Sequence, residues 1–382
     1  MPHIKVAPFN TEIIDTIKSN IIVFRAIGGA NSEIALVKFK DKELILDIIK
    51  KDKEYLIKPN KVTKGSDSNF LKELLNLFSD ELNLDILHTN TNIKPYKREF
   101  KHSALKSIEE FFDFSSSYKK IKLEVGFGSG RHLLYRAKEE RDTLFIGVEI
   151  HTPSISQLLN QISLEELDNI VVVNYDARLL CEMLKSNILD TIYVHFPVPW
   201  DKKPHRRVIS LAFLKEATRV LKKGGVLELR TDSENYYRYA LEVFSEPTKS
   251  SFVVEKNREL EVISKYEARW RRMDKNIYTL TFKALEESKD KNIEIDFRLN
   301  CRDKNISFPK ESIVKDDFFV HFGKVYKMQS GFVVECSFGS FNRPEKKMIV
   351  YNGKSCYYLP TLPVKTLVNL KAHNLIKEVL NG

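Results

Sequence analysis

The chain has 382 residues, of which 42% are hydrophobic, and its formal net charge is +10. This hydrophobic content excludes a wholly disordered chain and is sufficient for two or three folded domains. The excess of positive charge favours an anionic partner, either a nucleic acid or an anionic membrane surface. No apolar stretch approaches the roughly 20 residues of a membrane helix and the N-terminus has no apolar signal core, so we expect a soluble cytoplasmic protein.

The first hundred residues predict a separate α+β module. Short β-branched runs separated by turns predict strands over 21–27, 33–39 and 43–49. Ser66-Asp67-Ser68 then offers N-cap residues for a helix whose apolar side carries Leu71, Leu74, Leu75, Leu77 and Phe78. Residues 88–102 are polar, basic and poorly periodic, so this linker either follows a phosphate backbone or is a solvated connector.

Residues 101–284 alternate between strand and helix patterns. We expect strands at 121–125, 143–148, 170–174, 190–195, 226–230 and 278–282. Helices lie between them, and the helix over 210–221 is expected to end at Lys222-Lys223-Gly224-Gly225, because cations followed by glycine favour a helix end. This alternation is typical of a parallel, doubly wound α/β sheet.

The last hundred residues predict a small β-rich module with a terminal helix. The charged segment 286–291 marks its boundary, so we expect this third domain over 285–382. Its strands are expected near 294–299, 317–322, 331–338 and 347–351, and its helix over 364–380.

The cysteines predict neither a metal site nor a disulfide framework. They form no CxxC pair and no Cys/His cluster at zinc spacing: Cys181, Cys301, Cys336 and Cys356. Reduced thiols and no bound metal are therefore expected.

A glycine-rich segment marks a nucleotide-like site. Gly126, Gly128 and Gly130 follow a predicted strand and open a predicted helix, which lets the backbone turn tightly and approach a ligand closely. Glu149 ends the next predicted strand, about 20 residues further on, where an acid can accept hydrogen bonds from ribose hydroxyls.

Two cofactors compete for this site. A dinucleotide needs room for a pyrophosphate, but the glycine spacing is not GxGxxG and Glu124 stands two residues before the first glycine. A carboxylate there disfavours pyrophosphate and favours a cationic amino-acid head. Asp176, at the end of a third strand, is placed to bind an adenine amino group. The three acids together favour S-adenosylmethionine over a nicotinamide dinucleotide.

The segment 195–207 predicts the substrate side of the site. Two prolines end a predicted strand and hold Trp200 at its end, where ligands bind in an open α/β sheet. The ring either walls a base pocket or is packed core. The cations that follow are expected to contact phosphates: Lys202, Lys203, Arg206 and Arg207.

Residues 121–283 resemble the bacterial tRNA (guanine-N7)-methyltransferases. The blocks that carry the resemblance are LEVGFGSG, GVEIHTP, NYDA, HFPVPWDKKPHRR, ELRTDSENYYRYALEVF and SKYEARWRR. The resemblance implies a Rossmann-like class I S-adenosylmethionine-dependent methyltransferase fold. It also implies methylation at N7 of guanosine 46 in the tRNA variable loop, with tRNA as partner and no evident obligate protein partner.

Residue roles follow from the same resemblance. It puts the S-adenosylmethionine contacts at Glu124, Glu149 and Asp176 around the glycine loop. It puts substrate contacts at Lys202, Asp232, Ser264, Lys265, Tyr266 and Glu267, to which the cationic run adds Arg206 and Arg207.

The sequence departs from the family at one position. Family members normally carry an aspartate between the two prolines, where this chain has Val198. Because guanine N7 attacks through a lone pair and carries no proton, no base is needed there, and carboxylates near the purine can stabilise its developing charge. The catalytic candidates are then Asp232, which is alternatively a helix N-cap, and Glu267. An impaired methyltransferase-like tRNA-binding protein and a methyltransferase acting on another RNA stay as alternatives.

Overall fold

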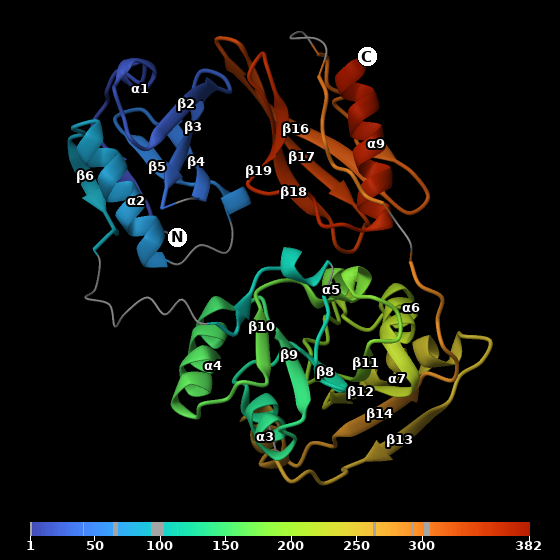
Figure 1. Ribbon diagram of the computed structural model, residues 1–382. Helices are drawn as coiled ribbons and strands as arrows, with labels where there is room; N and C mark the ends of the chain where they lie inside the picture. The colour runs from blue at the N-terminus through green and yellow to red at the C-terminus, as the bar shows by residue number, and fades with distance from the viewer. Residues whose placement is uncertain are drawn as a thin grey trace. The chain divides into compact units, whose positions relative to one another are not determined.

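The structure is a computed structural model that describes residues 2–40, 42–63, 68–92, 103–112, 114–262, 265–291, 294–301 and 306–382, with only the backbone of 63, 265 and 266. It forms two compact units (Figure 1). The first, here the two-segment unit, joins residues 1–99 to 295–382, and the second, here the α/β unit, spans 100–294. None of the helices in the described ranges is long and apolar enough to cross a bilayer.

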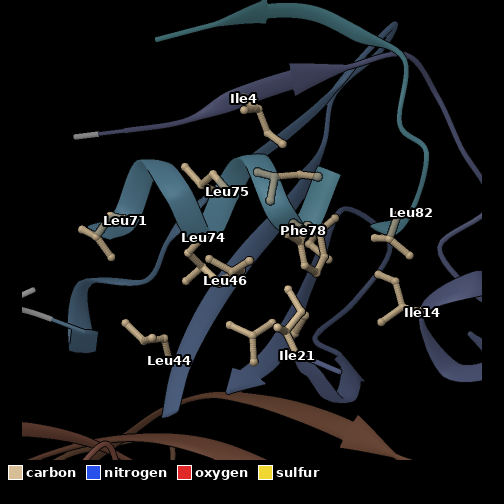
Figure 2. Packing of buried hydrophobic residues seen from close by; sticks show 14 of the residues in the cluster. Ile4, Ile14, Ile21, Leu44, Leu46, Leu71, Leu74, Leu75, Phe78 and Leu82 are labelled. Atoms are coloured by element: carbon tan, nitrogen blue, oxygen red, sulfur yellow. The ribbon is translucent and has the colours of Figure 1, made fainter. Parts of the chain in front are cut away.

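The N-terminal half of the two-segment unit is an antiparallel sheet covered by one helix. Its strands run in the order β2-β3-β4-β5-β1-β6. They are β1 (Ile4–Val6), β2 (Ile22–Ile27), β3 (Ser32–Phe39), β4 (Lys42–Lys50), β5 (Tyr55–Pro59) and β6 (Ile86–Thr89), with the short helix α1 (Ile13–Thr16) and a 3-10 turn (Lys61–Thr63). Helix α2 (Ser68–Glu81) buries Leu74, Leu75 and Phe78 against Leu44 and Leu46 (Figure 2). The predicted cap residues Ser66 and Asp67 lie outside the described residues.

The C-terminal half continues the same sheet. It consists of β15 (Ile313–Val314), β16 (Phe319–Met328), β17 (Gly331–Gly339), β18 (Glu345–Tyr351), β19 (Cys356–Leu359) and helix α9 (Leu367–Asn381). Strand β16 pairs with β2 where Lys327 lies opposite Ile27. A shared apolar cluster joins Leu36 and Ile45 to Val333 and Met348. Two segments predicted as separate modules therefore form one unit, because each supplies an apolar face that the other covers.

Residues 294–299 differ from the prediction of a strand. They make only an isolated bridge, between Leu299 and Cys356. Phe297 and Leu299 are nevertheless buried beside α9 residues such as Ile376. Their apolar alternation reflects this packing rather than a strand ladder.

The α/β unit is an eight-stranded sheet in the order β13-β14-β12-β11-β8-β9-β10-β7. Its strands are β7 (Leu105–Lys106), β8 (Lys120–Val125), β9 (Thr143–Val148), β10 (Ile170–Val173), β11 (Leu189–His195), β12 (Leu221–Thr231), β13 (Phe252–Lys256) and β14 (Tyr278–Lys283). Strands β7 to β12 are parallel and β13 and β14 run antiparallel. The predicted α/β alternation is confirmed, with a mixed rather than purely parallel sheet.

The helices of this unit lie in the connections between its strands, and most of these connections are crossovers between parallel strands. They are α3 (Arg131–Glu139), α4 (Thr152–Leu164), α5 (Ala177–Met183), α6 (Leu211–Val220), α7 (Glu234–Ser245) and α8 (Lys265–Arg271), with 3-10 turns at Glu109–Phe111 and Pro204–Arg206. The chain moves from β8 to β9 and β10 on one side and to β11 and β12 on the other. A crevice for a ligand is expected where the strand order reverses, beyond the carboxyl ends of β8 and β11.

Helix α6 ends within one residue of its predicted end, but Lys222-Lys223-Gly224-Gly225 do not form the helix stop that was predicted for them. Helix α6 ends at Val220, and these residues lie inside β12. The register of β11 on β12 shifts here, between Leu189 and Thr191. A Cβ on Gly225 would lie 3.0 Å from the Asp190 carbonyl oxygen. The two glycines therefore allow β12 to be irregular at the point where it passes close to β11.

Candidate active site

The glycine loop joins the end of β8 to the start of α3 and lies beside the end of β9. Gly126, Gly128 and Gly130 have φ angles of 69°, 54° and 71°, a region that favours glycine. The Gly126 amide donates to the Val148 carbonyl at 2.7 Å. A Cβ on Gly130 would meet Leu158 of α4 at 2.6 Å, whereas one on Gly126 would meet no atom within 4 Å. The loop is thus fixed on one side and open on the other, as a close-approaching ligand requires.

Glu149 lies directly beside this loop. Its carboxylate accepts hydrogen bonds from the amides of Gly128 (3.1 Å), Ile150 (2.8 Å) and His151 (3.0 Å). These bonds orient a half-buried acid at the end of β9. The position suits the predicted contact with ribose hydroxyls.

Asp176 is also at a strand end, but its carboxylate is engaged. It caps α5 by accepting from the Arg178 amide at 2.9 Å, and it pairs with the Arg178 guanidinium at 2.6 Å. An adenine amino group would therefore share this carboxylate with Arg178. The adenine contact stays a prediction.

Glu124 is buried and hydrogen-bonded to a histidine that the sequence analysis did not identify. Its side chain is 5% exposed, and Oε2 lies 2.8 Å from Nδ1 of His132 in the first turn of α3. The His132 ring packs against the rings of Tyr193 and His195, at centroid distances of 4.8 and 4.6 Å. Glu124 thus belongs to a cluster beneath the glycine loop.

A second carboxylate–histidine pair continues this cluster. Glu228 of β12 lies 2.9 Å from Nε2 of His195 and accepts from the Arg258 guanidinium at 2.6 Å. Burial works to raise the pKa of Glu228, but the hydrogen bonds and charges of His195 and Arg258 lower it to about 2. Burial also lowers the pKa of His195. A glutamate inside the apolar run Val226–Leu229 was the signal that could have revealed this network.

The segment after β11 is held in shape by Arg207. Its guanidinium donates to the Pro199 carbonyl at 2.7 Å, contacts Asp201 at 3.3 Å and lies 4.6 Å from the Tyr239 ring. Arg207 is 7% exposed. These surroundings favour a structural role over the predicted phosphate contact.

Other cations of this segment are exposed as predicted for phosphate contacts. Lys202, Lys203 and Arg206 all face solvent. The Arg206 guanidinium lies 5.1 Å from the Trp200 ring, which is 37% exposed and so is not packed core. Val198, between the two prolines, is 59% exposed. The surface of this segment therefore combines the aromatic ring of Trp200 with the exposed positive charges of these three cationic side chains.

Asp232 directly follows the last residue of β12. Its Oδ2 accepts from Lys275 Nζ at 3.0 Å, and that ammonium lies 3.9 Å from the Trp270 ring. The N-cap of α7 is Ser233, whose hydroxyl accepts from the Tyr236 amide. The alternative prediction, that Asp232 is the N-cap of α7, is therefore wrong. The Asp232 carboxylate is instead oriented by Lys275.

Glu267 is buried in an ion pair. Its Oε1 lies 2.8 Å from Nη2 of Arg230 and 2.8 Å from Nη2 of Arg271. Glu267 is 1% exposed and Arg230 0%. Arg230 also donates to Thr279 at 2.9 Å. These contacts fasten α8 to β12 and β14, which favours a structural role over direct contact with a substrate.

The remaining residues of that block are not placed. Ser264 lies outside the described residues, and only the helical backbone of Lys265 and Tyr266 is described. Their predicted substrate contacts stay predictions. Across the described ranges, no group of three or more His, Cys, Asp or Glu side chains could hold a metal ion.

Comparison with known proteins decides the family. Residues 118–280 match a family model described as "Putative methyltransferase". Over 355 residues, the chain is 38% identical to the tRNA (guanine-N(7)-)-methyltransferase of Wolinella succinogenes, with 92% of each chain covered. This chain belongs to the tRNA (guanine-N(7)-)-methyltransferase family. The family protein of Campylobacter fetus subsp. fetus is 36% identical, again with 92% of each covered, so the match extends well into the two-segment unit.

Membership of this family implies S-adenosylmethionine as the methyl donor, and the α/β unit has residues that suit it. Gly126 leaves open space where a Cβ would stand, which fits a ligand lying against the backbone. The acids Glu124 and Glu149 border the loop where a dinucleotide would need room for pyrophosphate. This donor set fits a cationic amino-acid head and a ribose, which is the chemistry of the methyl donor.

Proposed function

We propose that this protein transfers a methyl group from S-adenosylmethionine to N7 of guanosine 46 in the variable loop of tRNA. The observation that carries the proposal is its 38% identity, over 92% of both chains, to a tRNA (guanine-N(7)-)-methyltransferase. The geometry supports it, because an acid-bordered glycine loop and a cationic, aromatic segment follow neighbouring parallel strands of one sheet. Since tRNA is a cytoplasmic substrate, the enzyme acts in the cytoplasm.

The chemistry needs alignment and charge rather than a base. Bound S-adenosylmethionine supplies a methyl group on a positively charged sulfur. Glu149 would hold the ribose and Glu124 the amino-acid head. The purine gains positive charge when its N7 lone pair takes the methyl group. Asp232, oriented by Lys275, stabilises that charge and accepts from the purine N–H groups. Glu267 contributes indirectly, because its ion pair with Arg230 holds α8 in place.

The proposed activity is tested by identifying the methylated nucleoside. The protein is incubated with methyl-labelled S-adenosylmethionine and an unmodified tRNA transcript, and the RNA is digested to nucleosides. We expect the label in 7-methylguanosine. Binding of tRNA without transfer of label would instead support the impaired, tRNA-binding alternative, which Val198 motivates. Label in another nucleoside would mean a different reaction.

Lys202→Ala combined with Arg206→Ala is expected to weaken tRNA binding. Both cations are exposed beside Trp200. Loss of two phosphate contacts should lower the slope of log K against log salt by roughly 1.5 to 2. The measurement is the tRNA dissociation constant at several salt concentrations.

The matched control is Lys185→Ala with Lys223→Ala. It removes two exposed lysines near the amino ends of β11 and β12, away from the strand ends that form the site. Its salt slope should equal that of the unaltered protein. If both double variants change the slope equally, the cations act only through net charge and the phosphate contact is refuted.

A further inference from the structure

The cluster beneath the glycine loop brings together ionisable side chains from five parts of the α/β unit. Across the sheet, Tyr193 lies opposite Glu124 on one side and Glu228 on the other. His195 follows two residues after Tyr193, and His132 reaches the cluster from α3. Arg258 closes it on the Glu228 side. The groups of this cluster that carry a charge or can take up a proton are Glu124, His132, His195, Glu228 and Arg258.

The hydrogen bonds assign a proton to each imidazole. An ionised carboxylate only accepts, so the His132 nitrogen facing Glu124 is Nδ1–H and the His195 nitrogen facing Glu228 is Nε2–H. One N–H on each ring satisfies both contacts, so the neutral form of each histidine is sufficient for them. The ring centroids are 4.6 Å apart, which opposes a second positive charge once one ring is protonated.

In that state the cluster carries one surplus negative charge. Glu228 is balanced by Arg258, at 2.6 Å. Glu124 makes one side-chain hydrogen bond within the described ranges, to the neutral His132. A buried carboxylate without a cation costs free energy, so the site favours a ligand that brings one. The surplus charge stands two residues before the glycine loop.

We propose that His132 is a positioning residue, which holds Oε2 of Glu124 so that Oε1 accepts the ammonium group of S-adenosylmethionine. The ammonium supplies the positive charge that balances the cluster. The inference rests on the proposed function only in taking S-adenosylmethionine as the ligand. A proton on either imidazole supplies the same charge, so protons and the cofactor head compete.

This competition predicts a pH dependence of cofactor binding. The charged or titratable groups of the cluster around His132 are Glu124, Tyr193, His195, Glu228 and Arg258, with Arg136 and its partner Glu140 nearby and Glu255 sharing Arg258. Tyr193 stays neutral, because burial raises its pKa to about 12. A proton on either ring would supply the charge that the ammonium group brings, so we expect affinity for S-adenosylmethionine to fall as the pH is lowered.

The experiment compares His132→Leu, His132→Asn and His132→Gln in the full-length protein by titration calorimetry with S-adenosylmethionine. The asparagine amide places an N–H near the position of Nδ1, whereas the longer glutamine amide places it near Nε2. Loss of the Nδ1–H donor in the leucine variant should weaken binding about tenfold. Asparagine should restore affinity to within about threefold, and glutamine should not. All variants should keep their tRNA affinity.

The pH readout separates positioning from a merely structural role. Unaltered protein should lose affinity for S-adenosylmethionine as the pH is lowered, and His132→Asn should lose less. The control, His88→Asn, changes an exposed histidine of the two-segment unit and should match the unaltered protein. Equal affinities of the asparagine and glutamine variants would overturn the inference, even if the leucine variant does not fold. If unaltered protein does not bind S-adenosylmethionine at all, the proposed function itself fails.

Discussion

Replacing Glu267 by alanine is expected to lower the free energy of unfolding by about 3–5 kcal/mol, because it removes one partner of a buried ion pair. The guanidinium of Arg230 is fully buried 2.8 Å from Glu267 Oε1. Without that carboxylate, Arg230 keeps a charge in the interior that water cannot reach. Chemical denaturation of the variant and the unaltered protein measures the difference.

The control for this prediction is Glu234→Ala. Glu234 pairs with Arg238 at 2.7 Å, but both side chains are more than half exposed. Such surface pairs contribute about 0.2–1 kcal/mol, so this variant should unfold almost as the unaltered protein does. A Glu267→Ala protein that is equally stable yet inactive would contradict the structural role and favour the catalytic one.

Asp232→Asn is expected to lower kcat by roughly 10²–10³-fold, the usual range for losing one group that stabilises charge in a transition state. The substitution keeps the shape of the side chain and removes its charge. Because Asp232 follows β12 and not the glycine loop, affinity for S-adenosylmethionine should be unchanged. Single-turnover kinetics and cofactor titration together make the measurement.

Asp201→Asn is the matched control for Asp232. Asp201 belongs to the segment that lacks the family aspartate. Its side chain is 53% exposed and contacts Arg207 at 3.3 Å. We expect less than a few-fold change in kcat. If Asp201→Asn abolishes turnover and Asp232→Asn does not, Asp201 replaces the missing aspartate and the assignment of Asp232 is wrong.

The parallel sheet and its glycine loop could be predicted because their signals are local. Strand β9 has the predicted bounds, 143–148, since all six of its residues are buried and none is charged. Gly126, Gly128 and Gly130 all adopt positive φ, as a tight turn between strand and helix requires. Strand periodicity and turn chemistry depend on neighbouring residues, which the sequence displays directly.

Contacts between distant residues could not be predicted. The pairing of Glu267 with Arg230 joins residues 37 positions apart, and only folding shows that both are buried. Arg207 belonged to a cationic run, yet its guanidinium is turned between Pro199 and Tyr239. The single sheet of the two-segment unit likewise joins β2 to β16 across the whole α/β unit in sequence. Charge and periodicity carry no information about such partners.

The proposed reaction of this enzyme is methylation of one guanosine of tRNA at N7. Its most direct test compares two transcripts of one tRNA, one with guanosine at position 46 and one with adenosine there, using methyl-labelled S-adenosylmethionine. We predict 7-methylguanosine in the first transcript and background incorporation in the second. Equal incorporation into both transcripts, or none into the first, would contradict the account.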